Sequence, residues 1–432
     1  MSSESRVIQL DEIEKTPLRD AVMEESNWQA DLNYCMGCAK CLSVCPLHGY
    51  SEWDPRRLVR MVLLGMEQQV IDSDFIFQCT GCERCSLACP MGVKIGNLIT
   101  RARSMRPRDQ VPGGSQQTAD LHRTKGNNMQ IPTEEWIETL DWMKEEAQDD
   151  VPDLDFPIDQ EGADYFVTIN SKLPQYYPME LQCIYKVFHA ANISWTMPSI
   201  WWEGTNYAMF SGDLDTWEYT LRQQVERVEE LGCKYMAYTE CGHGYYATLA
   251  GYKKFGIKPK FEVVHKVNLY AQWMREGRFQ LDPSRNPQRV TLHDPCNAGR
   301  KAVLDGFPDV LEDTRYVLER VCPNFVEMWP NREYNYCCSG GGGALISGFA
   351  KARFHYGKVK VEQIDLTKAD LVCTPCVNCF DAIDDLAKHY QRPWKAIHLW
   401  SLLANALVFD DRQTETNPAG AADSVWQSEE PT

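Results

Sequence analysis

The sequence predicts an α+β protein of several domains, in which a helical, cysteine-rich N-terminal domain is followed by two pseudo-repeated α/β lobes. Three observations support this fold class. Residues 31–108 hold eight of the 18 cysteines. From residue 159 onward, short apolar strands alternate with helices, a pattern typical of parallel sheets. Residues 159–275 and 276–408 each contain such units, and each has a cysteine after a late strand, which predicts an internal repeat.

Length and composition agree with this architecture. A chain of 432 residues is long enough for two or three domains. Hydrophobic residues make up 44% and charged residues 24%, which is a globular balance and excludes a wholly disordered chain. The net charge of −17 would repel a phosphate backbone, so we expect no nucleic-acid partner.

The N-terminal sequence predicts that the protein is not exported. Residues 1–30 are polar and charged and are interpreted as an N-terminal arm, with acidic side chains where a signal peptide needs an apolar core. No apolar run approaches the roughly 18–20 residues of a membrane-spanning helix. We therefore expect a cytoplasmic protein. In that reducing compartment, clustered cysteines are more often metal ligands or catalytic thiols than disulfides.

The remaining segments are assigned from periodicity and composition. Residues 109–158 are predicted to form an acidic linker with one helix, at 134–150, and residues 409–432 a polar tail. In the two lobes the pattern predicts one clear helix, Leu214–Leu231, and four strands: Tyr165–Ile169, Tyr235–Tyr238, Arg289–Leu292 and Leu371–Cys373.

Two cysteine motifs in the N-terminal domain have the spacing C-x2-C-x2-C-x3-C followed by proline. This spacing is that of bacterial two-cluster ferredoxins, in which the fourth cysteine of each motif binds the other 4Fe–4S cluster. The predicted ligand sets are therefore Cys35, Cys38, Cys41 and Cys89 for one cubane cluster, and Cys79, Cys82, Cys85 and Cys45 for the other. Structural zinc is the alternative, but zinc sites rarely place four cysteines in so short a segment twice.

A second group of cysteines lies in the last lobe: Cys296, the vicinal pair Cys337–Cys338, and Cys373 with Cys376. Two of them follow predicted strands, and open α/β sheets build their sites at the carboxyl ends of strands. The glycines after the vicinal pair would let the backbone approach a bulky cofactor. A dinucleotide loop at these glycines is disfavoured because no G-x-G-x-x-G follows a strand. A thioredoxin-like redox pair is a weaker alternative for the final C-x-x-C.

The strings HDPCNAGRK, YCCSGGGG and CTPCVNC resemble the CCG domain of heterodisulfide reductase catalytic subunits. The eight-cysteine module, with PRRLVRMVLLG between its halves, resembles the helical ferredoxin subunit of the same family, here fused to it. The resemblance covers residues 31–108 and 160–405. It implies one noncubane 4Fe–4S cluster that acts on disulfide-type sulfur, in addition to the two cubane clusters. The implied noncubane ligands are Cys296, Cys337, Cys338, Cys373 and Cys376.

The first lobe departs from the family pattern. It has Ser171 where a cysteine is expected, Trp201 and Trp202 in place of a vicinal pair, and only Cys241 of the C-x-x-C. One thiol cannot hold such a cluster, so we expect none in this lobe. The asymmetry resembles the DsrK, HmcF and TmcB subunits of transmembrane redox complexes in sulfate-reducing microbes.

This resemblance implies peripheral attachment to the cytoplasmic face of the inner membrane. The implied partners are an integral-membrane quinone- or cytochrome-b-type subunit and other redox subunits. A DsrK-type protein would also have a small thiol or sulfur-carrier protein as a partner.

The predicted function is an iron–sulfur electron-transfer subunit of a heterodisulfide-reductase-like oxidoreductase, acting on a disulfide, persulfide or trisulfide or on a redox partner. Two alternatives stay open: an electron relay without substrate chemistry, and the iron–sulfur subunit of a flavin-dependent glycolate, lactate or glycerol-3-phosphate dehydrogenase. The roles of Cys241, His243, His293 and Cys379 also stay open. His293, three residues before a predicted ligand, either hydrogen-bonds cluster sulfur, donates a proton or is structural.

Overall fold

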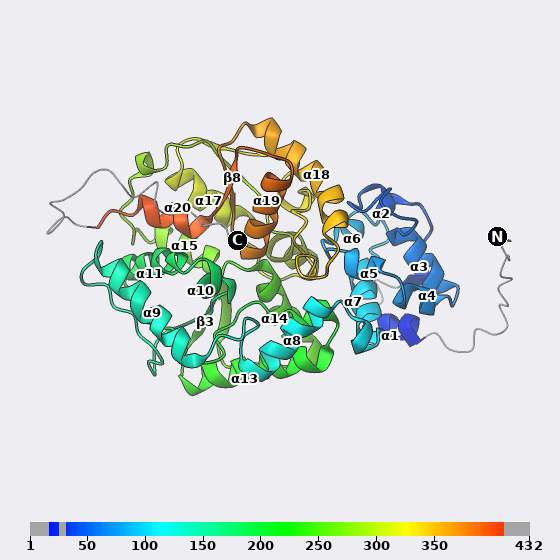
Figure 1. The fold of residues 1–432 in the computed structure, drawn as a ribbon, viewed down its shortest axis with the longest axis horizontal. Helices are drawn as coiled ribbons and strands as arrows, with labels where there is room; N and C mark the ends of the chain where they lie inside the picture. The colour runs from blue at the N-terminus through cyan, green and yellow to red at the C-terminus, as the bar shows by residue number, and fades with distance from the viewer. Residues whose placement is uncertain (1–16, 26–31, 410–432) are drawn as a thin grey trace, which may run out of the picture.

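The computed structural model describes residues 17–25 and 32–409. Figure 1 shows a helical N-terminal domain at one end of the molecule and a larger body, built from two sheets and their helices, at the other. The predicted arm contributes helix α1 (Pro17–Glu25). The rest of the arm, and the predicted tail beyond residue 409, lie outside the described residues.

The N-terminal domain consists of short helices packed around one longer helix, α7. Besides α1, they are α2 (Lys40–Ser43), α3 (Pro55–Leu63), α4 (Glu67–Ile71), α5 (Phe75–Gln78), α6 (Arg84–Leu87), α7 (Ile95–Met105) and the 3-10 turns η3 (Leu32–Tyr34) and η4 (Arg108–Gln110). Helix α3 shows why the sequence folds this way. Pro55 occupies its first position, and the Asp54 carboxylate accepts a hydrogen bond from the Arg57 backbone N–H at 2.9 Å.

The two lobes each contain a four-stranded parallel sheet with the same order. The orders are β2-β1-β3-β4 and β6-β5-β7-β8, so the predicted α+β class with two repeated lobes is confirmed. The first sheet contains β1 (Tyr165–Val167), β2 (Trp195–Thr196), β3 (Tyr235–Tyr238) and β4 (Glu262–His265). The second contains β5 (Val290–Leu292), β6 (Phe325–Val326), β7 (Leu371–Thr374) and β8 (Lys395–His398).

The four strands predicted from the sequence are β1, β3, β5 and β7, the two inner strands of each sheet. The other four were missed, and all of them lie at sheet edges. Edge strands here are only two to four residues long, and two of them begin at a charged residue, Glu262 or Lys395. A short apolar run with a charged end carries too little alternation to be recognised as a strand.

The helices of the lobes cover both sheets. The first lobe has α8 (Gly113–Lys125), α9 (Thr133–Gln148), α10 (Lys172–Tyr176), α11 (Met179–Ala191), α12 (Ala208–Ser211), α13 (Leu214–Glu230), α14 (Gly242–Phe255) and α15 (Lys266–Arg275). The second has α16 (Ala302–Asp305), α17 (Leu311–Val321), α18 (Ala350–Thr367), α19 (Val377–His389), α20 (Leu399–Ala406) and the turns η5 (Pro283–Arg285), η6 (Asn297–Lys301) and η7 (Arg332–Tyr334). No helix among the described residues combines the length and the apolar content that a membrane crossing requires.

The segment predicted as a linker with one helix carries two helices, α8 and α9. Helix α8 packs on α12 and α13, and α9 packs on α11, all in the first lobe. Trp136 of α9 is fully buried and stacks on Trp202 with ring centroids 4.3 Å apart. The acidic residues of α9 form its outer face, and this outward charge is what made the segment look like a linker.

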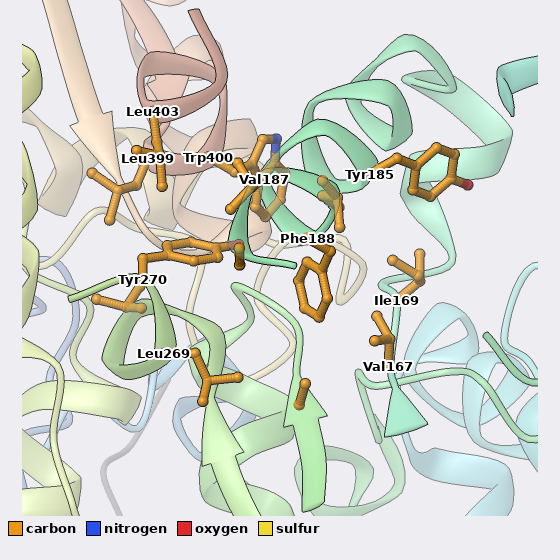
Figure 2. Close-up of a cluster of buried hydrophobic side chains, with 14 of the residues drawn as sticks. Val167, Ile169, Tyr185, Val187, Phe188, Leu269, Tyr270, Leu399, Trp400 and Leu403 are labelled. Atoms are coloured by element: carbon orange, nitrogen blue, oxygen red, sulfur yellow. The ribbon is translucent and has the colours of Figure 1, made fainter. Parts of the chain in front are cut away.

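A continuous hydrophobic core joins the two lobes (Figure 2). Phe188 on α11 and Tyr270 on α15 belong to the first lobe, while Trp400 and Leu403 on α20 belong to the second. Helix α11 packs directly on α20. At this contact the buried Glu180 carboxylate accepts hydrogen bonds from the Trp400 indole N–H and the Ser401 hydroxyl. The lobes therefore fold as one packed body.

This shared core predicts a large effect for one leucine. Leu403 is 0% exposed and Leu366, on the outer face of α18, is 82% exposed. Leu403→Ala should lower the free energy of unfolding by about 2–5 kcal/mol, because it removes buried methyl groups and leaves a cavity. Leu366→Ala should change it by no more than about 0.5 kcal/mol. Thermal and denaturant unfolding of the two full-length variants measures both effects, and equal losses would mean that the lobes do not share this core.

Candidate metal centres

The two N-terminal cysteine loops have the same backbone geometry. Gly37 and Ala39 have φ angles of 70° and 66°, and Gly81 and Glu83 at the matching positions both have φ of 59°. Positive φ is uncommon for alanine and glutamate and persists only where the surrounding structure holds it. In each loop the second of these residues starts a four-residue helix, α2 or α6. The loops thus turn around their thiols in the same way.

These loops bring eight thiols together in two groups of four, each group lining a cavity. One cavity is lined by Cys45 together with Cys79, Cys82 and Cys85. The other is lined by Cys89 together with Cys35, Cys38 and Cys41. In both groups three thiols come from one motif and the fourth from the other. The spacing predicts the same two sets.

The thiols in these cavities lie in an apolar environment. Burial raises the pKa of Cys41 and of Cys79 to about 11. The neighbouring thiols Cys35 and Cys89 raise the pKa of Cys41 further. Four thiolates so placed would repel one another, and a bound cationic centre removes that repulsion. Four cysteine thiols around one apolar cavity fit the ligand set of a 4Fe–4S cluster.

The second lobe holds a further group of thiols at the carboxyl edge of its sheet. Its members are at most 6% exposed: Cys296, Cys337, Cys338, Cys376 and Cys379. Cys296 follows β5 and starts η6, and Cys376 follows β7 and starts α19. The sulfurs of Cys338 and Cys379 lie 3.3 Å apart. Cys376 packs in one buried cluster with Cys338 and Cys379. Burial, and then the charges of Cys337 and Cys338, raise the pKa of Cys296.

Cys379 lies within this group of thiols, whereas Cys373, which the sequence predicts as a ligand, lies apart from it. Cys373 lies within β7, between Leu292 and Ile397 of the adjacent strands, and its nearest titratable neighbours are Cys322 and Glu240. The sequence offers C-x-x-C twice in the string CTPCVNC. Side chains alternate along a strand, whereas residues three apart in a helix share one face. The pair at the start of α19 therefore converges, and the strand cysteine points into the core.

The glycine run brings segments of protein backbone into close contact. A Cβ atom on Gly340 would lie 2.5 Å from the Asn378 carbonyl oxygen of α19. One on Gly341 would lie 2.5 Å from the Thr80 carbonyl oxygen in the N-terminal domain. Glycine is needed because this loop is pressed between α19 and the second N-terminal cysteine motif.

The second lobe and the N-terminal domain meet at their thiols. The Cys337 sulfur lies 3.4 Å from the Thr80 hydroxyl oxygen, and Cys337 together with burial raises the pKa of Cys82. The buried Arg300 guanidinium donates to the Cys82 carbonyl oxygen at 2.6 Å. Arg103 donates to the carbonyl oxygens of Cys79 and Gly342, at 2.7 and 2.8 Å. Two buried arginines therefore hold one N-terminal thiol group directly against the second-lobe group.

Buried basic residues surround the second-lobe thiols. One ring nitrogen of His293 lies within 4.8 Å of the sulfurs of Cys338 and Cys379, and burial lowers the pKa of this histidine. The fully buried Lys360 has a pKa lowered to about 7 by burial, an effect partly offset by Cys338. His293 was among the residues left open. Lys360 was missed, because nothing in the sequence of α18 distinguishes it from a surface lysine.

Two further histidines near this group, His265 and His398, were also missed. They end β4 and β8, and both are paired with the inner-strand residue at the same register position. The charge of Cys376 acts on both rings, although burial is the larger influence and lowers their pKa values to about 3. They were missed because the edge strands that carry them were missed.

The first-lobe residues singled out from the sequence lie close to one another. The positions of the missing cysteines are occupied by residues without a thiol. Cys241 starts α14, and the backbone beside it is joined across the lobe boundary to the backbone beside Cys376, because the Val377 N–H donates to the Glu240 carbonyl oxygen at 2.8 Å. The His243 ring is 2.9 Å from the Asn378 side-chain amide. Ser171 is fully buried near these residues. The first lobe thus faces the second-lobe thiols with one thiol and one imidazole.

Two family models match the chain: a 4Fe–4S dicluster domain over residues 17–94 and a cysteine-rich CCG domain over residues 290–384. An Hdr-like menaquinol oxidoreductase iron–sulfur subunit of Archaeoglobus profundus is 26% identical over 65% of this chain and 57% of its own length. An EtfAB:quinone oxidoreductase of Syntrophomonas wolfei is 23% identical over 74% of this chain and 44% of its own length.

A polypeptide of the dihydromethanophenazine:CoB–CoM heterodisulfide reductase of Methanosarcina mazei is 29% identical over 37% of each chain. The chain spans little more than half the length of the Archaeoglobus relatives that it matches. Together the domain matches and the relatives show that this chain is similar to heterodisulfide-reductase-like CCG iron–sulfur proteins.

Proposed function

We propose that this heterodisulfide-reductase-like protein is an electron-transfer subunit of a membrane-associated oxidoreductase, acting on disulfide, persulfide or trisulfide sulfur in its second lobe. The observation that carries the proposal is the close approach of Cys337 to the second N-terminal cysteine motif, where its sulfur lies 3.4 Å from the Thr80 hydroxyl oxygen. It joins a ferredoxin-type thiol group to a CCG-type thiol group without an intervening layer of protein. A protein built to move electrons between these two sites needs such a contact.

The proposed cofactors are two cubane clusters and one noncubane 4Fe–4S cluster. For the cubane clusters the proposed ligands are the two crossed sets, Cys35, Cys38, Cys41 and Cys89, and Cys45, Cys79, Cys82 and Cys85. For the noncubane cluster they are Cys296, Cys337, Cys338, Cys376 and Cys379, with Cys379 in place of Cys373. When bound, such clusters supply one-electron transfer over a wide range of potentials.

The chain's own residues set the environment of the second-lobe site. Backbone N–H groups of Ser339 and Gly340 donate to the sulfurs of Cys337 and Cys338, at 3.3 and 3.4 Å. Lys360 adds a buried amine beside the same sulfurs. N–H donors and nearby positive charge stabilise added negative charge, so these residues favour the reduced state of the site. The depth of the thiols excludes water from it.

The N-terminal domain offers a contact point for a redox partner. Cys38 is exposed, whereas the other seven thiols of this domain are buried or half-buried. Tyr34, Met36 and Met91 are exposed nearby, the last two lining the same cavity as Cys38. Relatives named as quinone and menaquinol oxidoreductases support a membrane quinone- or cytochrome-b-type partner at this surface. Such a partner would hold the protein at the cytoplasmic face of the membrane.

One observation favours a second function, an electron relay without substrate chemistry. None of the five second-lobe thiols is more than 6% exposed. A substrate would reach them only if the lobe boundary near Lys172 and Asp381 opened; the two side chains pair across it beside α19. A relay needs no such opening.

The proposed function predicts both cofactor content and reactivity. Anaerobically purified full chain should contain about 12 irons, because three 4Fe–4S clusters are proposed. It should also reoxidise dithionite-reduced benzyl viologen when 2-hydroxyethyl disulfide or glutathione persulfide is added. Iron analysis measures the cofactor content, and the absorbance of the dye measures its oxidation. About 12 irons without sulfur-dependent oxidation would support the relay, and about eight would remove the second-lobe cluster.

Crossed ligation predicts which cluster a single cysteine serves. Cys45→Ser should damage the cluster of Cys79, Cys82 and Cys85 and leave the other N-terminal cluster intact. Low-temperature EPR of the reduced protein distinguishes the two signals. Cys183→Ser, on α11 of the first lobe, is the matched control and should keep all signals. Loss of the cluster of Cys35 and Cys38 instead would show that each motif binds its own cluster.

The corrected ligand set predicts opposite results for two neighbouring cysteines. Cys379→Ser should lower the iron content from about 12 to about 8 per chain, because a proposed ligand of the noncubane cluster is lost. Cys373→Ser should keep about 12, although it places a hydroxyl in the sheet core and should lower the unfolding midpoint. The reverse pattern of iron loss would restore the ligand set expected from the sequence.

A further inference from the structure

The N-terminal domain differs in charge from the rest of the chain. Residues 32–108 carry ten basic and six acidic side chains, although the net charge of the whole chain is −17. This domain forms one end of the molecule, and its helix α3 lies on the side that faces away from the two lobes (Figure 1). An excess of positive charge at one end of an acidic protein points to a negatively charged partner at that end.

The outer face of α3 carries part of this positive charge. Arg56 and Arg60 are exposed and lie four residues apart, on the same face of the helix, and the exposed Leu64 follows one turn later. Lys40, at the start of α2, is also exposed, and α2 packs on α3. None of these three cations forms an ion pair with another described residue. Their charges are therefore available to a partner.

The acidic residues closest to α3 in the sequence are held by contacts within the domain. The Asp54 carboxylate accepts a hydrogen bond from the Arg57 N–H, and Glu52 pairs with the Arg57 guanidinium at 2.9 Å. Glu67 is buried and accepts hydrogen bonds from two backbone N–H groups of α1. These contacts leave the exposed cations without a counter-charge at short range.

Apolar side chains are exposed beside the cations. Met36 is 66% exposed, Tyr34 45% and Met91 37%. Met36 and Met91 line the same cavity as Arg56, and the turn that ends at Tyr34 packs on α3. Exposed apolar groups among cations are typical of a protein surface that binds a membrane, because the cations meet lipid phosphates and the apolar groups enter the headgroup region. Tyrosine is also enriched at that depth.

The outer face of α18 in the second lobe lacks this combination. Leu366 is 82% exposed, but the preceding turns carry Lys358 and Glu362, which form an ion pair at 3.9 Å. The two charges offset each other, so we expect no attraction of this face to an anionic surface. Helix α18 therefore provides a control for α3.

We propose that the α3 side of the N-terminal domain binds the anionic headgroups of membrane lipids. This inference rests on the proposed function, in which the redox partner is an integral-membrane subunit, and it names the surface around that partner. Lipid fits the cations better than the partner's own loops do, because cytoplasmic loops of membrane proteins carry an excess of Lys and Arg whereas the lipid surface beside them is negative. At physiological salt, exposed charges interact over about 8–10 Å, so the acidic lobes do not oppose this contact.

Binding on this side would also place the first N-terminal thiol group beside the membrane. Cys38, the exposed thiol of this domain, lies between Met36 and Lys40 in the sequence. A redox group of the membrane partner would then approach Cys38 without crossing the rest of the protein. The second-lobe thiols, at the opposite side of the N-terminal domain, would face away from the lipid.

The test measures how much of the anaerobic full chain sediments with vesicles at neutral pH and about 0.1 M NaCl. Vesicles of phosphatidylcholine with about one-third phosphatidylglycerol should bind the protein, and vesicles of phosphatidylcholine alone should not. Arg60→Gln should lower the partition coefficient about fivefold, the loss expected for one cation at an anionic surface. Its iron content should equal that of the wild type. Raising NaCl to about 0.5 M should release the wild type, because salt screens exposed charges.

Lys358→Gln is the matched control, since it also removes one exposed cation from the outer face of a helix, and it should bind as the wild type does. No binding to the anionic vesicles, or equal binding by wild type and Arg60→Gln, would overturn the inference. Binding to immobilised polyglutamate but not to vesicles would also overturn it and would point to an acidic protein as the occupant. Iron content and sulfur-dependent dye oxidation are measured without vesicles, so the proposed function stands or fails separately.

Discussion

The close approach of the Cys337 loop to the second N-terminal cysteine motif is the constraint on which the rest of the molecule depends. Two sulfur-bearing loops from separate domains can touch only if their backbones come unusually close. The glycine run permits that approach, and the buried guanidinium groups of Arg103 and Arg300 hold it through carbonyl oxygens on both sides. Each arginine has several donors in a fixed geometry, so one side chain can satisfy several buried carbonyls at once. A lysine at either place would leave carbonyls unsatisfied.

The two lobes are packed as one body for a related reason. A site at the carboxyl edge of one sheet is open on the side that faces the other lobe, and the first lobe closes it. Cys241 and Cys376 occupy matching positions at the starts of α14 and α19, and the Val377 N–H donates to the Glu240 carbonyl oxygen across the boundary beside them. The core around Phe188 and Trp400 holds α11 against α20 and thereby keeps these two helix starts together (Figure 2). The packing of α11 against α20 thus determines how well water is excluded from the second-lobe site.

The sequence predicted the fold class, the inner strands and both crossed sets of N-terminal thiols, because all three depend on local patterns. Strand alternation and cysteine spacing are set within about ten residues. What it could not predict depends on the direction of a side chain or on distant contacts. Cys373 and Cys379 have identical spacing to Cys376, and only the boundary between β7 and α19 decides which of them converges. Lys360 resembles any helix-surface lysine in the sequence; its burial beside Cys338 follows from the packing of α18.

The degenerate first lobe is best understood through what replaced its cysteines. A lobe that had merely lost a site would be expected to fill the volume with apolar side chains, since buried polar groups without partners cost free energy. Here Trp202 packs outward on Trp136, and the interior position beside it is taken by Glu203, whose carboxyl is buried with one oxygen unpaired. Burial raises the pKa of this carboxyl, so it holds a proton more readily than an exposed glutamate does. The two lobes therefore present different chemistry at their boundary, with a group of thiols on one side and a carboxyl, a hydroxyl and one thiol on the other.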